Sequence, residues 1–118
     1  MKKFRTLYTR EQRLKEFKRI ISKYPSRIPI VIDIEGPGLI LDKRKYLAQQ
    51  DMFMVYFQHT IRQRLQVGPN ESLFFFYGNT IPNPTQTLGQ LYKEAPSQDG
   101  FMVLTVAKEN TFGYIENT

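Results

Sequence analysis

Isoleucine occupies every second position from Ile28 to Ile34, and it alternates there with Pro29, Val31, Asp33 and Glu35. A period of two is the signature of a β-strand with one face buried, because successive side chains of a strand point to opposite faces. Gly36-Pro37-Gly38 follows as a turn signal, and a second extended segment is expected over 43–48. The two segments predict a β-hairpin. Pro29 cannot donate to a ladder, so it must lie where no donor is required.

A helix with a basic outer face is predicted before this hairpin. Thr9 and Gln12 have the spacing of a capping box, which satisfies the first backbone N–H groups of a helix. Apolar residues then recur at helical intervals until Pro25, namely Leu14, Phe17, Ile20, Ile21 and Tyr24. Residues 2–8 are expected to form a short preceding helix or an arm. A second long helix is predicted over 51–65, and Gly68-Pro69 closes it.

Three further elements complete the order along the chain. The run 73–77 predicts a short aromatic buried strand, Thr87 and Gln90 again have capping-box spacing before a short helix, and 101–107 predicts a last strand. The order of helix, two strands, helix, strand, short helix and strand is that of an α+β ubiquitin-like β-grasp with two additional N-terminal helical segments. We therefore expect a basic helical segment at 1–27 packed on a core at 28–107, and a flexible tail at 108–118.

Composition argues against an enzyme. The chain of 118 residues fits one domain, and its lack of cysteine excludes a thiol nucleophile, disulfides and Cys-based metal sites. His59 is the single histidine, no two acidic residues have the spacing of a general acid and base, and phosphate-loop patterns are absent. No catalytic residue, cofactor or metal is predicted. The longest apolar run, Leu73 to Tyr77, is far shorter than the roughly 20 residues that span a bilayer.

Positive charge is concentrated at the start of the chain. Residues 1–27 carry a net charge of +8, whereas the remainder of the chain carries −2, for a total of +6. This asymmetry predicts an acidic partner for the first segment. RNA and an acidic protein surface such as the tubulin tail both fit, and so does a solvated basic face without a partner. No base-reading motif accompanies the basic residues, so nucleic acid is the less expected partner.

The end of the chain places a glycine close to the C-terminus. Gly113 follows the polar segment Glu109 to Phe112, and five residues, Tyr114 to Thr118, come after it. Glycine has no Cβ, so its carbonyl is accessible to attack in a narrow enzymatic channel. Residues 114–118 then act as a removable cap on a carboxylate that becomes functional. A frayed terminus is the alternative interpretation.

Six blocks of sequence resemble the autophagy ubiquitin-like modifiers, the GABARAP and microtubule-associated light-chain family. They are Lys23–Pro29, Leu41–Leu47, Ile61–Arg64, Leu73–Phe76, Asp99–Phe101 and Glu109–Gly113, in the family's order and over nearly the whole chain. The resemblance implies that a cysteine protease cuts after Gly113, with Phe74, Phe76 and Phe112 in its recognition. It also implies transfer by E1-like and E2-like enzymes to phosphatidylethanolamine, which moves a cytoplasmic protein to the autophagosome membrane.

The resemblance also implies capture of short acidic aromatic-x-x-aliphatic peptides from cargo receptors and adaptors, by strand addition beside the second strand. Matching positions for the first pocket are Glu16, Ile20, Pro29, Val31, Lys45, Leu47 and Phe101. For the second pocket they are Tyr46, Ala48, Gln49, Met52, Phe57 and Thr60. Arg27, Lys43, Lys45 and Arg64 are basic residues that suit the acidic flanks of such peptides. Gln49, His59 and Thr60 depart from the family, and we expect them to make the second pocket more polar. A cytoskeletal or RNA-binding adaptor acting through residues 1–27 is the alternative function.

Overall fold

The computed structural model describes residues 2–108 and contains four helices and four strands in that range. In chain order they are α1 (Phe4–Leu7), α2 (Arg10–Lys23), β1 (Arg27–Glu35), β2 (Lys45–Gln49), α3 (Met54–Arg64), β3 (Leu73–Tyr77), α4 (Leu88–Glu94) and β4 (Met102–Lys108). This is the order predicted from the sequence, and residues 2–8 supply a short helix. None of the described helices has the length and apolar character needed to cross a membrane.

The strands form one mixed sheet in the order β2-β1-β4-β3. β1 pairs antiparallel with β2 and parallel with β4, and β3 pairs antiparallel with β4. β1 and β4 are therefore the central strands, and β2 and β3 form the two edges. The predicted hairpin is confirmed, with its second strand over Lys45–Gln49 instead of 43–48.

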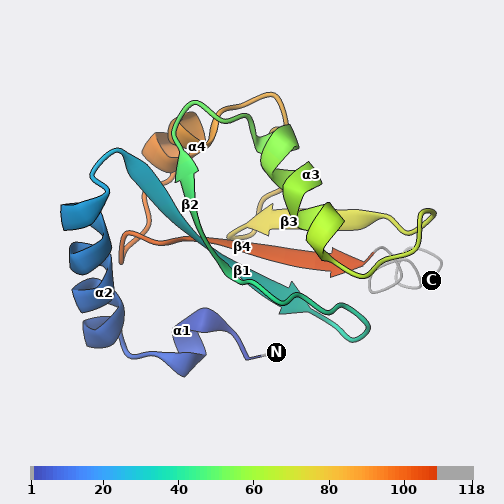
Figure 1. The fold of residues 1–118 in the computed structure, drawn as a ribbon, viewed down its shortest axis with the longest axis horizontal. Coiled ribbons are helices and arrows are strands. Elements are labelled where there is room, and N and C mark those ends of the chain that lie inside the picture. Colours follow the sequence, from blue (N-terminus) through green and yellow to red (C-terminus); the bar gives the residue numbers. More distant parts are fainter. Residues whose placement is uncertain (1, 109–118) are drawn as a thin grey trace.

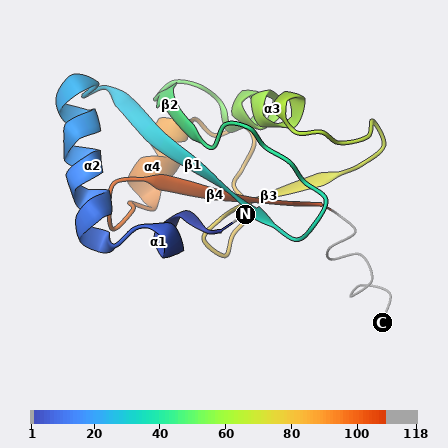
Figure 2. The ribbon, with the colours of Figure 1, turned by 60° about the horizontal axis from the view of Figure 1, so that its bottom comes forward.

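The sheet separates two layers of helices (Figures 1 and 2). The alternating isoleucines of β1 face α3 and α4, where they join Met54, Phe57, Ile61 and Leu88 in the main core. α1 and α2 cover part of the opposite face, over a smaller apolar cluster of Phe4, Val31, Phe101 and Val103. Only part of the predicted apolar stripe of α2 is buried. Phe17 and Ile20 are partly buried against this cluster, whereas Tyr24 is exposed.

Element boundaries differ from the predicted ones where chain contacts outweigh the apolar pattern. α3 begins at Met54 and not at residue 51, because Phe53 forms a β-bridge with Thr87 and residues 50–51 make a turn. β4 continues through Lys108, which pairs with Leu73, so this residue belongs to the sheet and not to the predicted tail; the rest of that prediction, 109–118, lies outside the described residues. In β3 only Phe75 is buried, because the strand lies at an edge of the sheet.

Both predicted capping boxes are present. In each, the threonine hydroxyl accepts from the backbone N–H three residues on, and the glutamine side chain accepts from the threonine N–H. These contacts fix the start of α2 at Thr9 and of α4 at Thr87. α4 lies so close to the turn after β2 that a Cβ on Gly89 would meet the Gln50 carbonyl oxygen at 2.9 Å.

Candidate functional site

The outer edge of β2 is open to an added strand. Ile32 N–H donates to the Arg44 carbonyl, which makes these two residues a hydrogen-bonded pair. Such pairs alternate along an antiparallel ladder, so the backbone groups of Tyr46 and Ala48 also bond to β1. The N–H and C=O groups of Lys45 and Leu47 then point away from β1, toward the edge. Pro29 is the partner of Leu47 in this register, so its missing N–H costs no bond to β2.

A groove of about 530 Å³ lies beside this edge, between α2 and the sheet. β1 and β2 supply Pro29 and Leu47, α2 supplies Ile20, and Phe101 comes from the start of β4. Leu47 is 38% exposed, so this apolar surface is open to solvent. Groove residues that the sequence analysis did not assign to the binding site are Arg19, Lys23, Tyr24 and Ile30. Helical spacing from Glu16 and Ile20 could have indicated Arg19, Lys23 and Tyr24.

The structure brings six of the seven first-pocket residues to this groove. Val31 is the exception, because it is 1% exposed and packs beneath the surface with Phe4 and Phe101. Glu16 stands at the rim, where Arg19 holds it through two hydrogen bonds of 2.6 and 3.1 Å. These bonds lower the pKa of the Glu16 carboxyl, so the rim carries a fixed negative group among cations.

The second predicted pocket lies on the other face of β2, toward α3. Tyr46 and Phe57 pack edge to face with ring centroids 5.7 Å apart, and Ala48 lies buried in the same core. Met52 is partly buried against them. Thr60 is exposed, and its hydroxyl donates to the Tyr56 carbonyl of its own helix. Because the hydroxyl proton is already bonded within the helix, Thr60 makes the pocket less polar than a free hydroxyl would.

Two of the expected departures in this pocket are wrong, because strand and helix periodicity turn the side chains elsewhere. Gln49 belongs with Lys45 and Leu47 on the α2 face of β2, as the burial alternation of that strand shows. His59 lines a separate hollow between α3 and β3, with Leu73 and Phe75. Neither residue makes the pocket around Tyr46 more polar.

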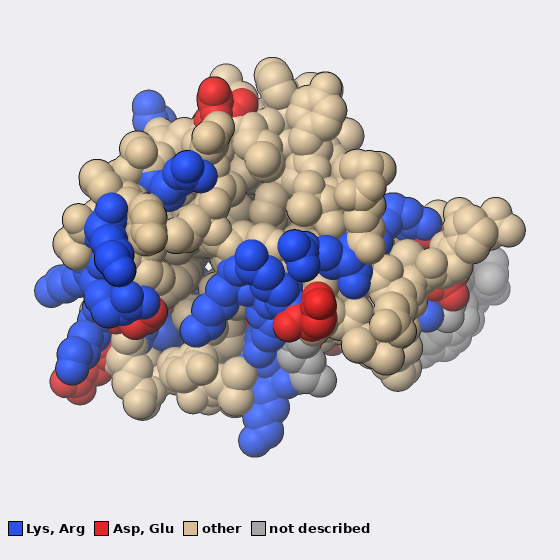
Figure 3. All heavy atoms as spheres, viewed as in Figure 1, with Lys and Arg blue, Asp and Glu red and all other residues tan. Residues whose placement is uncertain are grey.

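Cations surround the open edge. The Lys43 Nζ lies 5.1 Å from the centroid of the Tyr46 ring, and the Arg64 Cζ lies 5.9 Å from it. Lys45 lies over the ring of Tyr8 from the α1–α2 connection, at 5.3 Å. Figure 3 shows Lys and Arg side chains along α2 and across the middle of the same face. The site therefore favours ligands with negative charge on both sides of an apolar segment.

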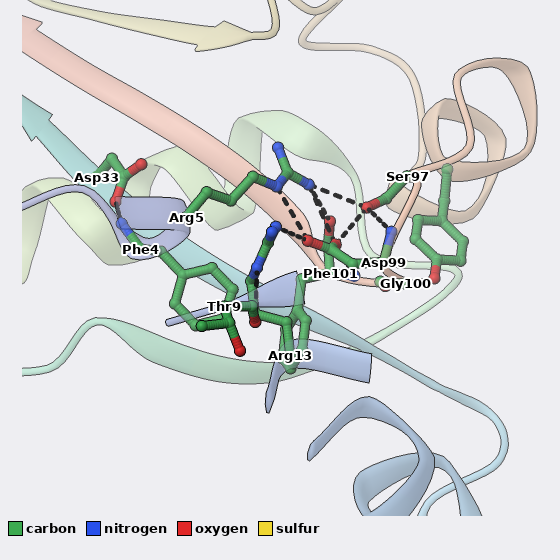
Figure 4. Close-up of polar contacts among 10 residues, drawn as sticks. Phe4, Arg5, Thr9, Arg13, Asp33, Ser97, Asp99, Gly100 and Phe101 are labelled. Carbon is green, nitrogen blue, oxygen red and sulfur yellow. Dashed lines mark hydrogen bonds and ion pairs between the residues drawn. The ribbon is translucent and has the colours of Figure 1, made fainter. Parts of the chain in front are cut away.

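A buried carboxylate fixes both N-terminal helices to the core. The Asp99 side chain is fully buried and accepts from Arg5 of α1 at 3.0 and 3.1 Å and from Arg13 of α2 at 2.5 Å. It also accepts from the Ser97 hydroxyl and the Phe101 N–H (Figure 4). Burial alone would raise the pKa of Asp99, but these donors hold that pKa well below its ordinary value. The network positions Phe101, which lines the groove.

A second buried carboxylate, Asp33 of β1, holds the start of α1. It accepts from the Phe4 N–H at 2.9 Å and from the Arg44 guanidinium at 2.5 Å. Asp33 thereby satisfies one of the N–H groups that a helix start leaves without a partner. The sequence analysis missed Asp33 and Asp99 as structural groups, since each looks like an ordinary polar position in a strand or turn.

Of the remaining predicted site residues, Arg27 lines a hollow with Gln49 at the end of β2, and the others lie on the opposite edge of the sheet or outside the described part. Phe74 and Phe76 are on the edge strand β3, on the face opposite Phe75, with ring centroids 6.5 Å apart. Gly113 and Phe112 lie outside residues 2–108. No group of three or more potential metal-ligating side chains occurs within the described residues.

Comparison with known proteins identifies the family. The family described as "Autophagy protein Atg8 ubiquitin like" matches residues 12–113 of this chain. The chain belongs to the Atg8 family. It is 36% identical over 115 residues to autophagy-related protein 8h of Arabidopsis thaliana, covering 96% of this chain and 97% of that protein. Protein 8a of the same plant is 36% identical over 105 residues, or 87% and 86% of the two chains.

Solved structures agree with this membership in the Atg8 family. Plasmodium falciparum Atg8, solved in complex with a P. falciparum Atg3 peptide, superposes with a TM-score of 0.78 at 26% identity, over 90% of this chain and 95% of that one. Trypanosoma brucei ATG8 superposes with a TM-score of 0.80 over 92% and 96%, and at 22% identity it supports the fold. The protein is thus a ubiquitin-like modifier of autophagy, and the adaptor alternative is not favoured.

Proposed function

We propose that this Atg8-family modifier recruits cargo receptors and adaptors by adding their acidic aromatic-x-x-aliphatic segments as a strand to β2. The observation that carries the proposal is the open edge of β2, which lies between two apolar surfaces on opposite faces of the strand. An added strand points alternate side chains to opposite faces, so two anchors that lie three positions apart, as in the aromatic-x-x-aliphatic segment, reach both surfaces.

The same groove also suits a peptide of a conjugation enzyme. P. falciparum Atg8 is known in complex with an Atg3 peptide, and its similarity to this chain extends over nearly the whole fold. An Atg3-like E2 enzyme is therefore our candidate partner, beside an E1-like enzyme and a processing cysteine protease. Phe74, Phe76 and Phe112 are our candidates for contact with that protease.

Peptide capture is tested at Lys45, which lies at the edge of the groove. Lys45→Glu should weaken binding of an acidic Trp-x-x-Leu peptide by roughly fivefold to tenfold in calorimetry, because attraction at the rim becomes repulsion. Lys93→Glu is the matched control, since Lys93 is exposed on α4 and this substitution changes the charge by the same amount. Equal affinity of the wild type and Lys45→Glu would remove the β2 edge as the binding site.

The C-terminus is proposed to be cut after Gly113 and joined to phosphatidylethanolamine, which moves the protein from the cytoplasm to autophagosome membranes. Two acyl chains reach the level required for stable anchoring. Gly113→Ala should block both removal of 114–118 and lipid attachment in a cell extract, because a Cβ obstructs the carbonyl. Intact-mass measurement reports both products, and Glu116→Ala is the control within the removed segment. A lipidated product of equal yield from Gly113→Ala would contradict the assignment.

A further inference from the structure

The segment that follows β4 repeats the pattern of the ligand that we propose for the β2 edge. Phe112 and Ile115 are an aromatic and an aliphatic residue that lie three positions apart. Glu109 precedes this pair and Glu116 follows it directly, and the sequence has no Lys or Arg over 109–118. The cations around the β2 edge favour such a ligand, because it carries negative charge on both sides of an apolar segment.

The same spacing elsewhere in the chain belongs to elements of the fold. It occurs at Phe4–Leu7, Phe17–Ile20 and Phe101–Leu104, which lie in α1, in α2 and at the start of β4. The aromatic side chains of these three segments pack in the smaller apolar cluster or against it. Phe112–Ile115 is the occurrence that lies beyond the last strand.

Phe112 cannot reach the groove of its own chain. In the sheet, Ala107 of β4 is level with Glu35 of β1, and Leu47 of the groove is level with Pro29. The end of β4, one position beyond Ala107, therefore lies about 23 Å from the groove along the strands and about 10 Å across them. Figure 1 shows β4 ending at the opposite side of the sheet from α2. From there to Phe112 the chain spans at most about 14 Å, so only a second copy can supply the groove.

The order of the two apolar surfaces gives the direction in which the segment binds. The first surface lies at Leu47, and the second reaches Met52, beyond the carboxyl end of β2. A segment whose aromatic residue precedes its aliphatic residue therefore runs parallel to β2. In this direction Glu109 lies on the side of Lys43 and Lys45, so one register satisfies both the acidic group and the apolar anchors.

We infer that residues 109–118 of one copy bind as an added strand to the β2 edge of a second copy, with Phe112 in the groove and Ile115 in the pocket around Tyr46. The inference rests on the proposed peptide capture and adds a partner to it, the unprocessed protein itself. The bond after Gly113 lies between the two anchors, so the proposed cleavage separates them and ends the self-association. Processing thereby frees the groove for cargo receptors in the same step that exposes the new carboxylate.

Sedimentation of the full chain from about 10 µM to about 1 mM tests the self-association, since two anchoring side chains imply a dissociation constant of the order of 100 µM. The average mass of the wild type should rise over this range. Ile115→Ser should weaken the association at least about tenfold, the effect of one buried isoleucine side chain. Ile81→Ser is the matched control, because Ile81 is 63% exposed and lies outside the groove, and it should associate as the wild type does. A monomeric wild type, or an association that Ile115→Ser leaves unchanged, overturns the inference.

Mixing two variants identifies the two surfaces that meet. Leu47→Glu alters the groove and keeps the segment, whereas Ile115→Ser keeps the groove and alters the segment. Each variant alone should be monomeric near the wild-type dissociation constant, and an equal mixture should form pairs. The contact joins unlike surfaces, so the wild type can grow beyond a dimer whereas the mixture stops there. Thermal unfolding verifies the fold of each variant, and a mixture that stays monomeric overturns the assignment.

An acidic Trp-x-x-Leu peptide separates this inference from the capture on which it rests. The peptide should compete for the groove and return the associated wild type to the monomer. A wild type that binds the peptide but does not self-associate overturns the self-association alone. Failure of the peptide to bind overturns the proposed capture as well.

Discussion

Replacing Asp99 by Asn should destabilise the protein by about 3 kcal/mol. Removing one partner of a buried ion pair costs roughly 3–5 kcal/mol, because the other charge stays buried without compensation. The Arg13 side chain is 11% exposed and matches that case, whereas Arg5 is 36% exposed and contributes under about 1 kcal/mol after solvent screening. Asparagine retains an acceptor oxygen, so the total loss of unfolding free energy should lie near the lower limit of the 3–5 kcal/mol range. The total free energy of unfolding of a single domain is about 5–15 kcal/mol, so this loss is a large part of it.

Urea unfolding followed by circular dichroism measures this free energy, and a melting temperature lower by roughly 10 °C is the matching thermal result. Glu16→Gln is the control, because it breaks the Glu16–Arg19 pair, whose side chains are 40% and 62% exposed, and it should change the free energy of unfolding far less than Asp99→Asn does. A loss below about 1 kcal/mol for Asp99→Asn, or one equal to that of Glu16→Gln, would refute the reasoning.

The pH dependence of the same difference gives an independent check. The folded-state pKa of Asp99 is depressed, so its contribution is fully present above the unfolded value near 3.8 and is lost as pH falls through the acid range below it. The gap in unfolding free energy between wild type and Asp99→Asn should therefore stay constant at neutral pH and narrow below about pH 4. A gap that is unchanged there would mean that the lost energy is not electrostatic.

Two further predictions concern local geometry. Gly100→Ala should lower the free energy of unfolding in urea by at least about 2 kcal/mol, because φ is +89° and the added Cβ would lie 2.3 Å from the Phe17 ring. Gly78→Ala is the control, since its φ is +62° and the space around it is open, and it should lower the same free energy by about 1 kcal/mol. Equal losses would contradict the role given to Phe17. Thr87→Ala should cost about 1 kcal/mol by the same measurement, since Thr87 Oγ1 accepts from Gln90 N–H at 3.1 Å, and Thr87→Ser should retain most of that energy. A full loss in Thr87→Ser would exclude the cap as the cause.

The sequence allowed the order of elements and most of the groove to be predicted, because alternation and helical spacing are local signals. Asp33 and Asp99 were beyond its reach, since their partners Phe4 and Arg5 lie 29 and 94 positions away. The face of β2 on which Gln49 lies also depends on the strand register, and a hairpin prediction does not fix that register to within one residue. A register shift of one exchanges the two faces, so the pockets of β2 could not be assigned securely without the pairing.

The shared anchoring of α1 and α2 determines which experiments can report on the basic N-terminal segment. A four-residue helix has little stability of its own, so α1 depends on Asp33 and Asp99 for its position. Deleting 1–27 would remove the Phe4 donor of Asp33 and the Arg5 and Arg13 donors of Asp99, uncover Phe101 and remove one wall of the groove. Loss of any interaction after such a truncation would therefore not identify the partner of the basic residues. Reversing charges at exposed positions of α2, such as Lys15 and Lys18, changes the surface and leaves the anchors in place.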